Sequence, residues 1–237
     1  MWFILPIHKS LQGYLLEMAD DLIAPNDKRD PYFFFHAKDL WHGSGFFQRK
    51  QWALKKRLEI LEHLADIPRK FKLPIVYSCL RREDFVPKDL RGKARAKADS
   101  KCHATCFLNC LSIVDQWISQ NCPDEQAFAI IEHHQTHKGS LQLVAETLSD
   151  PRTADEIRRD DEMKWEPLNH FVETPLFAEK NGSSPLQIAD VCAFILNKAL
   201  AGAKHSEHML KKIEPQLVTG FRYNFFETPD QDPETFS

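Results

Sequence analysis

The chain has 237 residues, a formal net charge of −3 at pH 7 and 43% hydrophobic residues. These values are typical of one large globular domain with a hydrophobic core, and they exclude disorder of the chain as a whole. A net charge so close to zero gives no general attraction to nucleic acid or to an anionic membrane. Binding of either kind therefore requires a local patch of charge.

Six cysteines are spread along the chain without a C-x-x-C pair, which favours a reducing compartment over a disulfide-stapled domain. The apolar start, residues 1–7, is too short for a signal-peptide core or a membrane span. We therefore expect a cytoplasmic protein. Cys102, Cys106 and Cys110 repeat on one helical face, where cysteine behaves as a small buried hydrophobe, and this predicts core packing.

Apolar residues at helical spacing predict helices over residues 11–23, 51–67, 102–119, 140–148 and 185–200. Pro68 is expected to end the second of these helices. Short apolar runs predict strands over residues 32–35, 74–79 and 127–131. Residues 151–164 are highly charged and indicate a surface excursion. Strands that alternate with helices predict one α/β domain over residues 1–226, followed by a flexible tail over residues 227–237.

The helix over residues 185–200 has a well-marked start. Ser184 can serve as the N-cap, Pro185 suits the first helical position, and Gln187 completes a capping box. Asp190 is an isolated acid in this apolar helix, where an unpaired carboxylate is costly. Two interpretations stay open: a metal-binding or catalytic role, or pairing with a buried arginine or with backbone donors.

Residues 184–190, with the sequence SPLQIAD, resemble the S-x-x-L-Q-x-A-D signature of the domain of unknown function 3800 family, whose fold is RNase H-like. Residues 35–40 followed by Gly43 and Gly45 resemble the E-h-H-A-x-x-h segment of that family, and residues 129–132 resemble its acid-ended central strand. The resemblance covers roughly residues 1–200. It implies an RNase H-like mixed sheet flanked by helices.

Proteins of this fold hold Mg²⁺ or Mn²⁺ with clustered acids, and the metal activates water and stabilises the leaving oxygen of a phosphodiester. The resemblance therefore implies a metal-dependent nuclease in which Glu132 and Asp190 bind the metal. The Asp-Glu-Ser-Gly strand that opens the family has no counterpart, because residues 1–6 align with the strand that follows it, so the N-terminal strand is truncated or missing. Either it lies upstream of Met1, or the chain is an inactive RNase H-like module that binds without cutting.

The family often places a glutamate just before its His-Ala pair, and here that position is a phenylalanine. His36, Asp39 and Asp30 are candidate substitutes, and we expect His36 and Asp39 to be catalytic together with Glu132 and Asp190. A small-molecule enzyme that uses His36 and Asp39 as acid and base is a third alternative. It is disfavoured because the sequence contains no phosphate-binding loop, nucleophile elbow or dinucleotide fingerprint.

Two further patterns could bind ligands. His133 and His137 have the i, i+4 spacing that a helix could use for zinc, although the more favoured interpretation places His133 or His134 in the cleft beside Glu132. Lys93, Arg95 and Lys97 belong to the densest basic run, which predicts contacts with a nucleic-acid backbone if the run is not simply a solvated loop. Near the glycines, Trp41 and His42 could stack on bases.

Overall fold

The computed structural model describes residues 5–23, 33–133, 137–150, 152, 168–172 and 175–218. Asp30, His134, most of the predicted excursion over residues 151–164 and the predicted tail over residues 227–237 lie outside the described residues.

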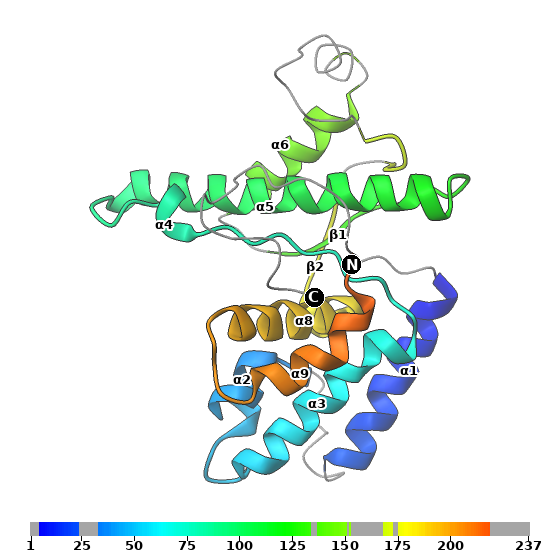
Figure 1. Ribbon diagram of the computed structural model, residues 1–237, viewed down its shortest axis with the longest axis vertical. Coiled ribbons are helices and arrows are strands. Elements are labelled where there is room, and N and C mark those ends of the chain that lie inside the picture. Colours follow the sequence, from blue (N-terminus) through cyan, green and yellow to red (C-terminus); the bar gives the residue numbers. More distant parts are fainter. Residues whose placement is uncertain are drawn as a thin grey trace.

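The largest hydrophobic core lies among five helices in the lower half of Figure 1. These helices are α1 (Leu5–Leu22), α2 (Ala37–His42), α3 (Leu54–Lys70), α8 (Ser184–Leu200) and α9 (Ser206–Ile213). Their apolar residues recur every three or four positions, so each helix buries one stripe against the others. Ile60, Leu61 and Leu64 of α3 and Ile188 of α8 are fully buried in this core.

A second group of helices lies above this core in Figure 1: the long helix α5 (Gly92–Asn121), with α6 (Lys138–Ser149) and the short helix α4 (Arg82–Phe85) packed against it. The buried acid Asp115 of α5 accepts hydrogen bonds from the backbone N–H groups of Asn169 and His170, at 2.8 to 3.2 Å. Asp115 thereby attaches residues 168–171 to α5.

Between the two groups runs a short parallel sheet of β1 (Ile130–Glu132) and β2 (Leu176–Ala178). Its register pairs Glu132 with Ala178, and single parallel bridges join Ala127 to Phe171 and Ile75 to Leu217. Three short 3₁₀ helices complete the described chain, namely η2 (Gly45–Phe47), η3 (Lys180–Gly182) and η4 (Glu214–Gln216).

The described chain is mostly helical with a small parallel sheet, so it is α/β in the broad sense that the sequence predicts. The sequence predicts strands at two places where the described chain forms none. Residues 33–35 have no regular secondary structure, and of residues 74–79 only Ile75 forms a bridge. Residues 130–132 form the strand predicted over 127–131, displaced toward Glu132. An apolar run becomes a strand only where a second backbone pairs with it.

Several predicted helix ends are wrong. Helix α5 begins at Gly92, ten residues before the predicted start, and α3 continues through Pro68 to Lys70. Helix α8 begins one residue earlier than predicted, with Ser183 as its N-cap and no side-chain capping bond. Pro68 has no N–H to donate to the carbonyl of Leu64, so the last turn of α3 lacks one hydrogen bond, and the helix ends two residues later while the proline ring is buried.

The cysteine stripe is not part of the main core. Cys102, Cys106 and Cys110 are half-buried, and the buried face of α5 instead includes Leu111, Val114 and Ile118. Burial nonetheless raises the pKa of the Cys110 thiol to about 11, which keeps it protonated at neutral pH.

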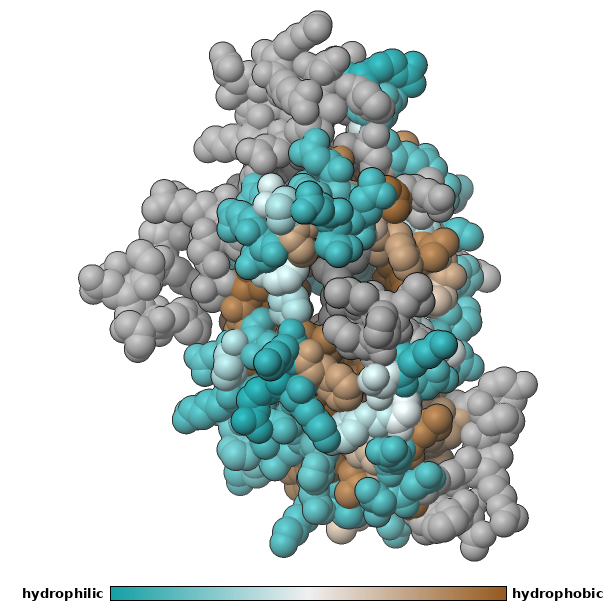
Figure 2. Space-filling model, turned by 90° about the vertical axis from the view of Figure 1, so that its right-hand side faces the viewer, coloured by the Kyte–Doolittle hydropathy of each residue, from teal (hydrophilic) through white to brown (hydrophobic). Residues whose placement is uncertain are grey.

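Polar side chains cover most of the described surface on the face drawn in Figure 2, and apolar side chains appear there in separate patches. Within the described ranges, none of the helices combines the length and the apolar composition that crossing a membrane requires.

Candidate functional site

Three distant parts of the chain meet beside the sheet, namely the start of α2, the end of β1 and the segment from η3 to α8. Glu132 ends β1, η3 follows β2, Asp190 lies in the second turn of α8, and His36 precedes α2. The structure thus brings together the four residues that the sequence predicts as catalytic, Glu132, Asp190, His36 and Asp39, in one cluster of ionisable side chains.

Lys180 of η3 lies at the centre of this cluster, although the sequence did not point to it. Its ammonium nitrogen Nζ is 3.0 Å from Oδ1 of Asp190 and 3.1 Å from Oε2 of Glu132. The lysine side chain is 9% exposed, whereas the side chain of Asp190 is 22% exposed and that of Glu132 is 52% exposed. A nearly buried cation therefore joins two acids that solvent can still reach.

The other oxygen of Asp190, Oδ2, faces the start of α2. It accepts a hydrogen bond of 3.1 Å from the backbone N–H of Ala37, which is one of the helix N–H groups that has no partner within the helix. Asp190 is thus satisfied by a lysine and a backbone donor. Backbone donation agrees with one of the two interpretations drawn from the sequence, but the cation is Lys180, not an arginine.

His36 links Asp190 to Asp39. Its ring nitrogen Nδ1 is 3.2 Å from Oδ2 of Asp39, and its other nitrogen, Nε2, is 3.9 Å from Oδ2 of Asp190. Oδ1 of Asp39 accepts a hydrogen bond of 2.6 Å from the hydroxyl of Ser44. With the Asp39 carboxylate fixed in this way, the Nδ1 edge of the imidazole is held and Nε2 is directed toward Asp190.

Gln187 and Gly45 position the backbone and side chains around the cluster. The Gln187 side chain accepts a hydrogen bond from the N–H of Phe35 and donates one to the carbonyl of Lys180, so it is not part of a capping box. Gly45 has a φ of +54°, and a Cβ at this position would lie 2.5 Å from Oδ2 of Asp39. Glycine is therefore required here both by the left-handed backbone and by the carboxylate packed against it.

The helical spacing that suggested zinc binding by His133 and His137 is not formed. His133 follows β1 outside any helix, where its Nδ1 lies 3.3 Å from a carboxylate oxygen of Glu179, and His137 precedes α6 with its ring 4.2 Å from that of His103. The two histidines therefore do not share a helical face. Across the described ranges, no three His, Cys, Asp or Glu side chains are grouped as metal ligands.

The predicted nucleic-acid contacts, Lys93, Arg95 and Lys97, lie in the first two turns of α5 rather than in a loop. Lys93 and Lys97 are exposed and, being four residues apart, share one helical face. In Figure 1 this end of α5 lies beside α4, away from the strands β1 and β2. The structure does not bring the basic residues to the acidic cluster.

Comparisons of the chain with protein-family models, with curated proteins and with solved structures found no match. The resemblance to the domain of unknown function 3800 family thus rests on the sequence motifs alone. The structure itself defines a cluster of three acids, one lysine and one histidine in a mostly helical α/β chain.

Proposed function

We propose that the protein is an RNase H-like, divalent-metal-dependent nuclease, in which Glu132 and Asp190 hold Mg²⁺ or Mn²⁺. The observation that carries the proposal is the convergence of these two carboxylates, 58 positions apart in the chain, on one ammonium nitrogen at 3.0 and 3.1 Å. Two acids that together stabilise a positive charge between a strand end and a late helix are the arrangement that the sequence motifs imply.

The donor set suits a hard divalent cation. Mg²⁺ is bound in many enzymes by one or two carboxylates, with water and substrate phosphate as the other ligands, so a third protein ligand is not required. Glu132 is half exposed and can change its rotamer, whereas Asp190 is held by Ala37. Binding requires the ammonium of Lys180 to move away from the carboxylates, and a bound metal would supply water activation and stabilisation of the leaving oxygen.

His36 is the residue best placed to move a proton. Asp39 lies at Nδ1 and so favours the tautomer that carries its proton there, which leaves Nε2 as an acceptor. The side chain is 29% exposed, so water reaches it. We infer that Nε2 of His36 takes the proton of the attacking water, with Asp39 orienting the ring as in other acid–histidine pairs.

Nucleic acid is the substrate class in this proposal. The exposed Lys93 and Lys97, with Arg95, would contact the phosphate backbone of a strand that extends beyond the acidic cluster, since such contacts need little more than arrayed cations. Their distance from the cluster means that they would support binding and not the chemical step.

A second candidate function is an inactive RNase H-like module that binds a partner without cutting. The observation that favours it is the Lys180 ammonium, which already pairs with both Glu132 and Asp190 and competes with a metal for the same oxygens. An internal ion pair of this kind lowers the gain from metal binding, because the carboxylates must first lose their lysine.

Titration calorimetry with Mn²⁺ separates the two candidates when it is combined with a cleavage assay on single- and double-stranded DNA and RNA. For the nuclease, we expect Mn²⁺ binding and metal-dependent cleavage by the unmodified chain, and loss of both in Asp190→Asn. Asp66→Asn is the matched control, because Asp66 pairs with Arg69 on α3 outside the cluster. The absence of both binding and cleavage in the unmodified chain would favour the inactive module.

A further inference from the structure

A pocket of about 470 Å³ lies at the end of α2 opposite His36. It is lined by Trp41, Arg49, Trp52, Leu54 and Arg57. Its volume falls within the range of small-molecule sites, about 300 to 1,000 Å³. None of these residues takes part in the acidic cluster, so the pocket is a separate feature of the molecule.

Arg57 is buried in the pocket wall with only 4% of its surface exposed. Its Nη1 donates to the carbonyls of Leu40 and Trp41, at 2.6 and 3.0 Å, and its Nε donates to the carbonyl of Trp52, at 3.1 Å. These acceptors are uncharged. Within the described ranges, Arg57 pairs with no carboxylate, although a buried charge is normally compensated by an opposite one.

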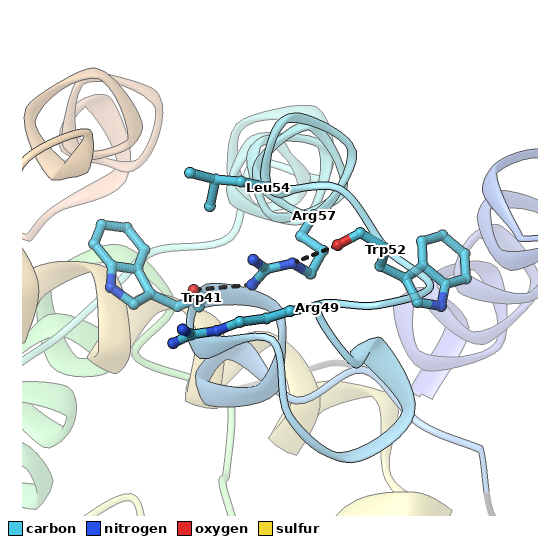
Figure 3. Close-up of a pocket in the computed structure, with 5 residues that line it drawn as sticks. All are labelled: Trp41, Arg49, Trp52, Leu54 and Arg57. Carbon is cyan, nitrogen blue, oxygen red and sulfur yellow. Dashed lines mark hydrogen bonds between the residues drawn. The ribbon is translucent and has the colours of Figure 1, made fainter.

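Arg49 adds a second guanidinium beside the first. In Figure 3 the two arginine side chains extend side by side in the direction of Trp41. Nε of Arg49 donates to the carbonyl of His42, and this side chain also lacks a carboxylate partner in the part of the chain that the structure describes. Gly43 makes the approach possible, because a Cβ on it would lie 2.8 Å from Cζ of Arg57.

The charge around this end of α2 is consistently positive. Burial, and then Lys198, Lys38, Arg49 and Arg57, lower the pKa of His42. Burial, and then Arg49, likewise lower the pKa of Arg57. Two guanidiniums that repel each other at a pocket gain most from an anion that binds both, as a phosphate does through paired N–H donors.

The remaining walls are apolar and partly exposed. Leu54 is 50% exposed at the rim, and the ring of Trp41 is half-buried and packs edge to face against Phe194. Trp52 contributes its carbonyl to the wall, while its ring packs against Phe47 at 5.3 Å. A flat ring placed beside Trp41 and Leu54 would cover apolar surface that is otherwise in water.

We propose that this pocket binds a molecule that carries a phosphate group and, one sugar away, a flat aromatic ring, with Arg49 and Arg57 on the phosphate and with Trp41 and Leu54 against the ring. A nucleotide has this chemistry, either as a free nucleoside monophosphate or as the 5′-phosphorylated end of a nucleic-acid strand. The site is independent of the proposed metal centre.

The test is titration calorimetry of adenosine 5′-monophosphate and of adenosine into the unmodified chain and into Arg49→Gln, Trp41→Leu and the control Arg69→Gln. We expect the monophosphate to bind and adenosine not to bind. Arg49→Gln should weaken binding about tenfold or more, because a hydrogen bond to a charged group is lost. Trp41→Leu should weaken it several-fold, and Arg69→Gln should leave it unchanged, since Arg69 lies on the last turn of α3 and pairs with Asp66.

Arg49 is the informative position because it is exposed, whereas Arg57 also holds the carbonyls at the end of α2 and its replacement endangers folding. Failure of the monophosphate to bind the unmodified chain, or equal binding by Arg49→Gln, would overturn the proposal. Oligonucleotides of one sequence, with a 5′-phosphate or a 5′-hydroxyl, identify the source of the phosphate. Tighter binding of the phosphorylated strand assigns the pocket to strand ends, and equal binding of the two strands assigns it to free nucleotides.

Discussion

Replacement of Lys180 by methionine removes the positive charge at the centre of the acidic cluster and keeps most of the volume of the side chain. Loss of one partner from a fully buried ion pair costs about 3 to 5 kcal/mol. The cost here is smaller because Glu132 is 52% exposed and exposed pairs contribute only about 0 to 1 kcal/mol. Asp190 also keeps its bond from Ala37. We therefore expect Lys180→Met to lower the free energy of unfolding by about 2 to 3 kcal/mol.

Urea denaturation at pH 7, followed by circular dichroism, measures this loss. For a chain of this size it corresponds to a decrease in Tm of about 4 to 12 °C. Lys211→Met is the control, because Lys211 forms an exposed i, i+4 pair with Glu207 and its loss should cost less than about 0.5 kcal/mol. The double variant Lys180→Met/Asp190→Asn should lose less free energy of unfolding than the two single variants lose together. A loss below about 1 kcal/mol for Lys180→Met would refute the reasoning.

Three further predictions concern stability. Gly45→Ala should destabilise the fold by about 1 to 2 kcal/mol, because the φ of Gly45 is +54° and the new Cβ would meet Asp39. Gly13→Ala inside α1 should instead stabilise the fold by up to about 1 kcal/mol. Thermal melts in which both variants shift Tm in the same direction would contradict this. Asp115→Ala leaves two backbone N–H groups without their acceptor and should cost about 3 kcal/mol in urea denaturation, with Asp115→Asn less harmful because it keeps an acceptor. Burial raises the pKa of Cys192 from 9.0 to about 12. Above pH 9 the unfolded thiol therefore loses its proton while the native thiol keeps it, so the free energy of unfolding falls as the pH rises, by about 1.4 kcal/mol per pH unit between pH 9 and pH 12. Unfolding curves of Cys192→Ala with the same pH slope as those of the unmodified chain would exclude this contribution.

The sequence predicted the acidic residues of the cluster, but it did not predict the lysine that pairs with them. Asp190 attracts attention because a lone carboxylate in an apolar helix needs a partner, and Glu132 because it ends an apolar run. Lys180 was missed, although the same argument asks for a cation near Asp190. A lysine ten residues upstream of that acid was the available signal, but no periodicity connects a 3₁₀ turn to the second turn of the next helix.

Periodicity predicted α1, α3, α5, α6 and α8, whereas α2, α4, α9, the strands and the charged start of α5 did not follow from it. The start of α5 contains alanine, lysine and arginine, which all favour helices, but its charge suggested a loop. The predicted strands over residues 32–35 and 74–79 contain the right residue types, yet a strand also depends on a pairing partner elsewhere in the chain. Such pairing is a tertiary property that local patterns do not contain.

The hydrogen bonds that close the acidic cluster join residues 152 and 153 positions apart, from Phe35 to Gln187 and from Ala37 to Asp190. During synthesis from the N-terminus, His36 and Glu132 leave the ribosome long before Lys180 and Asp190 exist. The same helix that carries Asp190 also supplies Ile188 and Ile195 to the main core. The nascent chain therefore gains its acidic cluster in the same step as the α8 part of its core, and a product that ends before α8 would have neither.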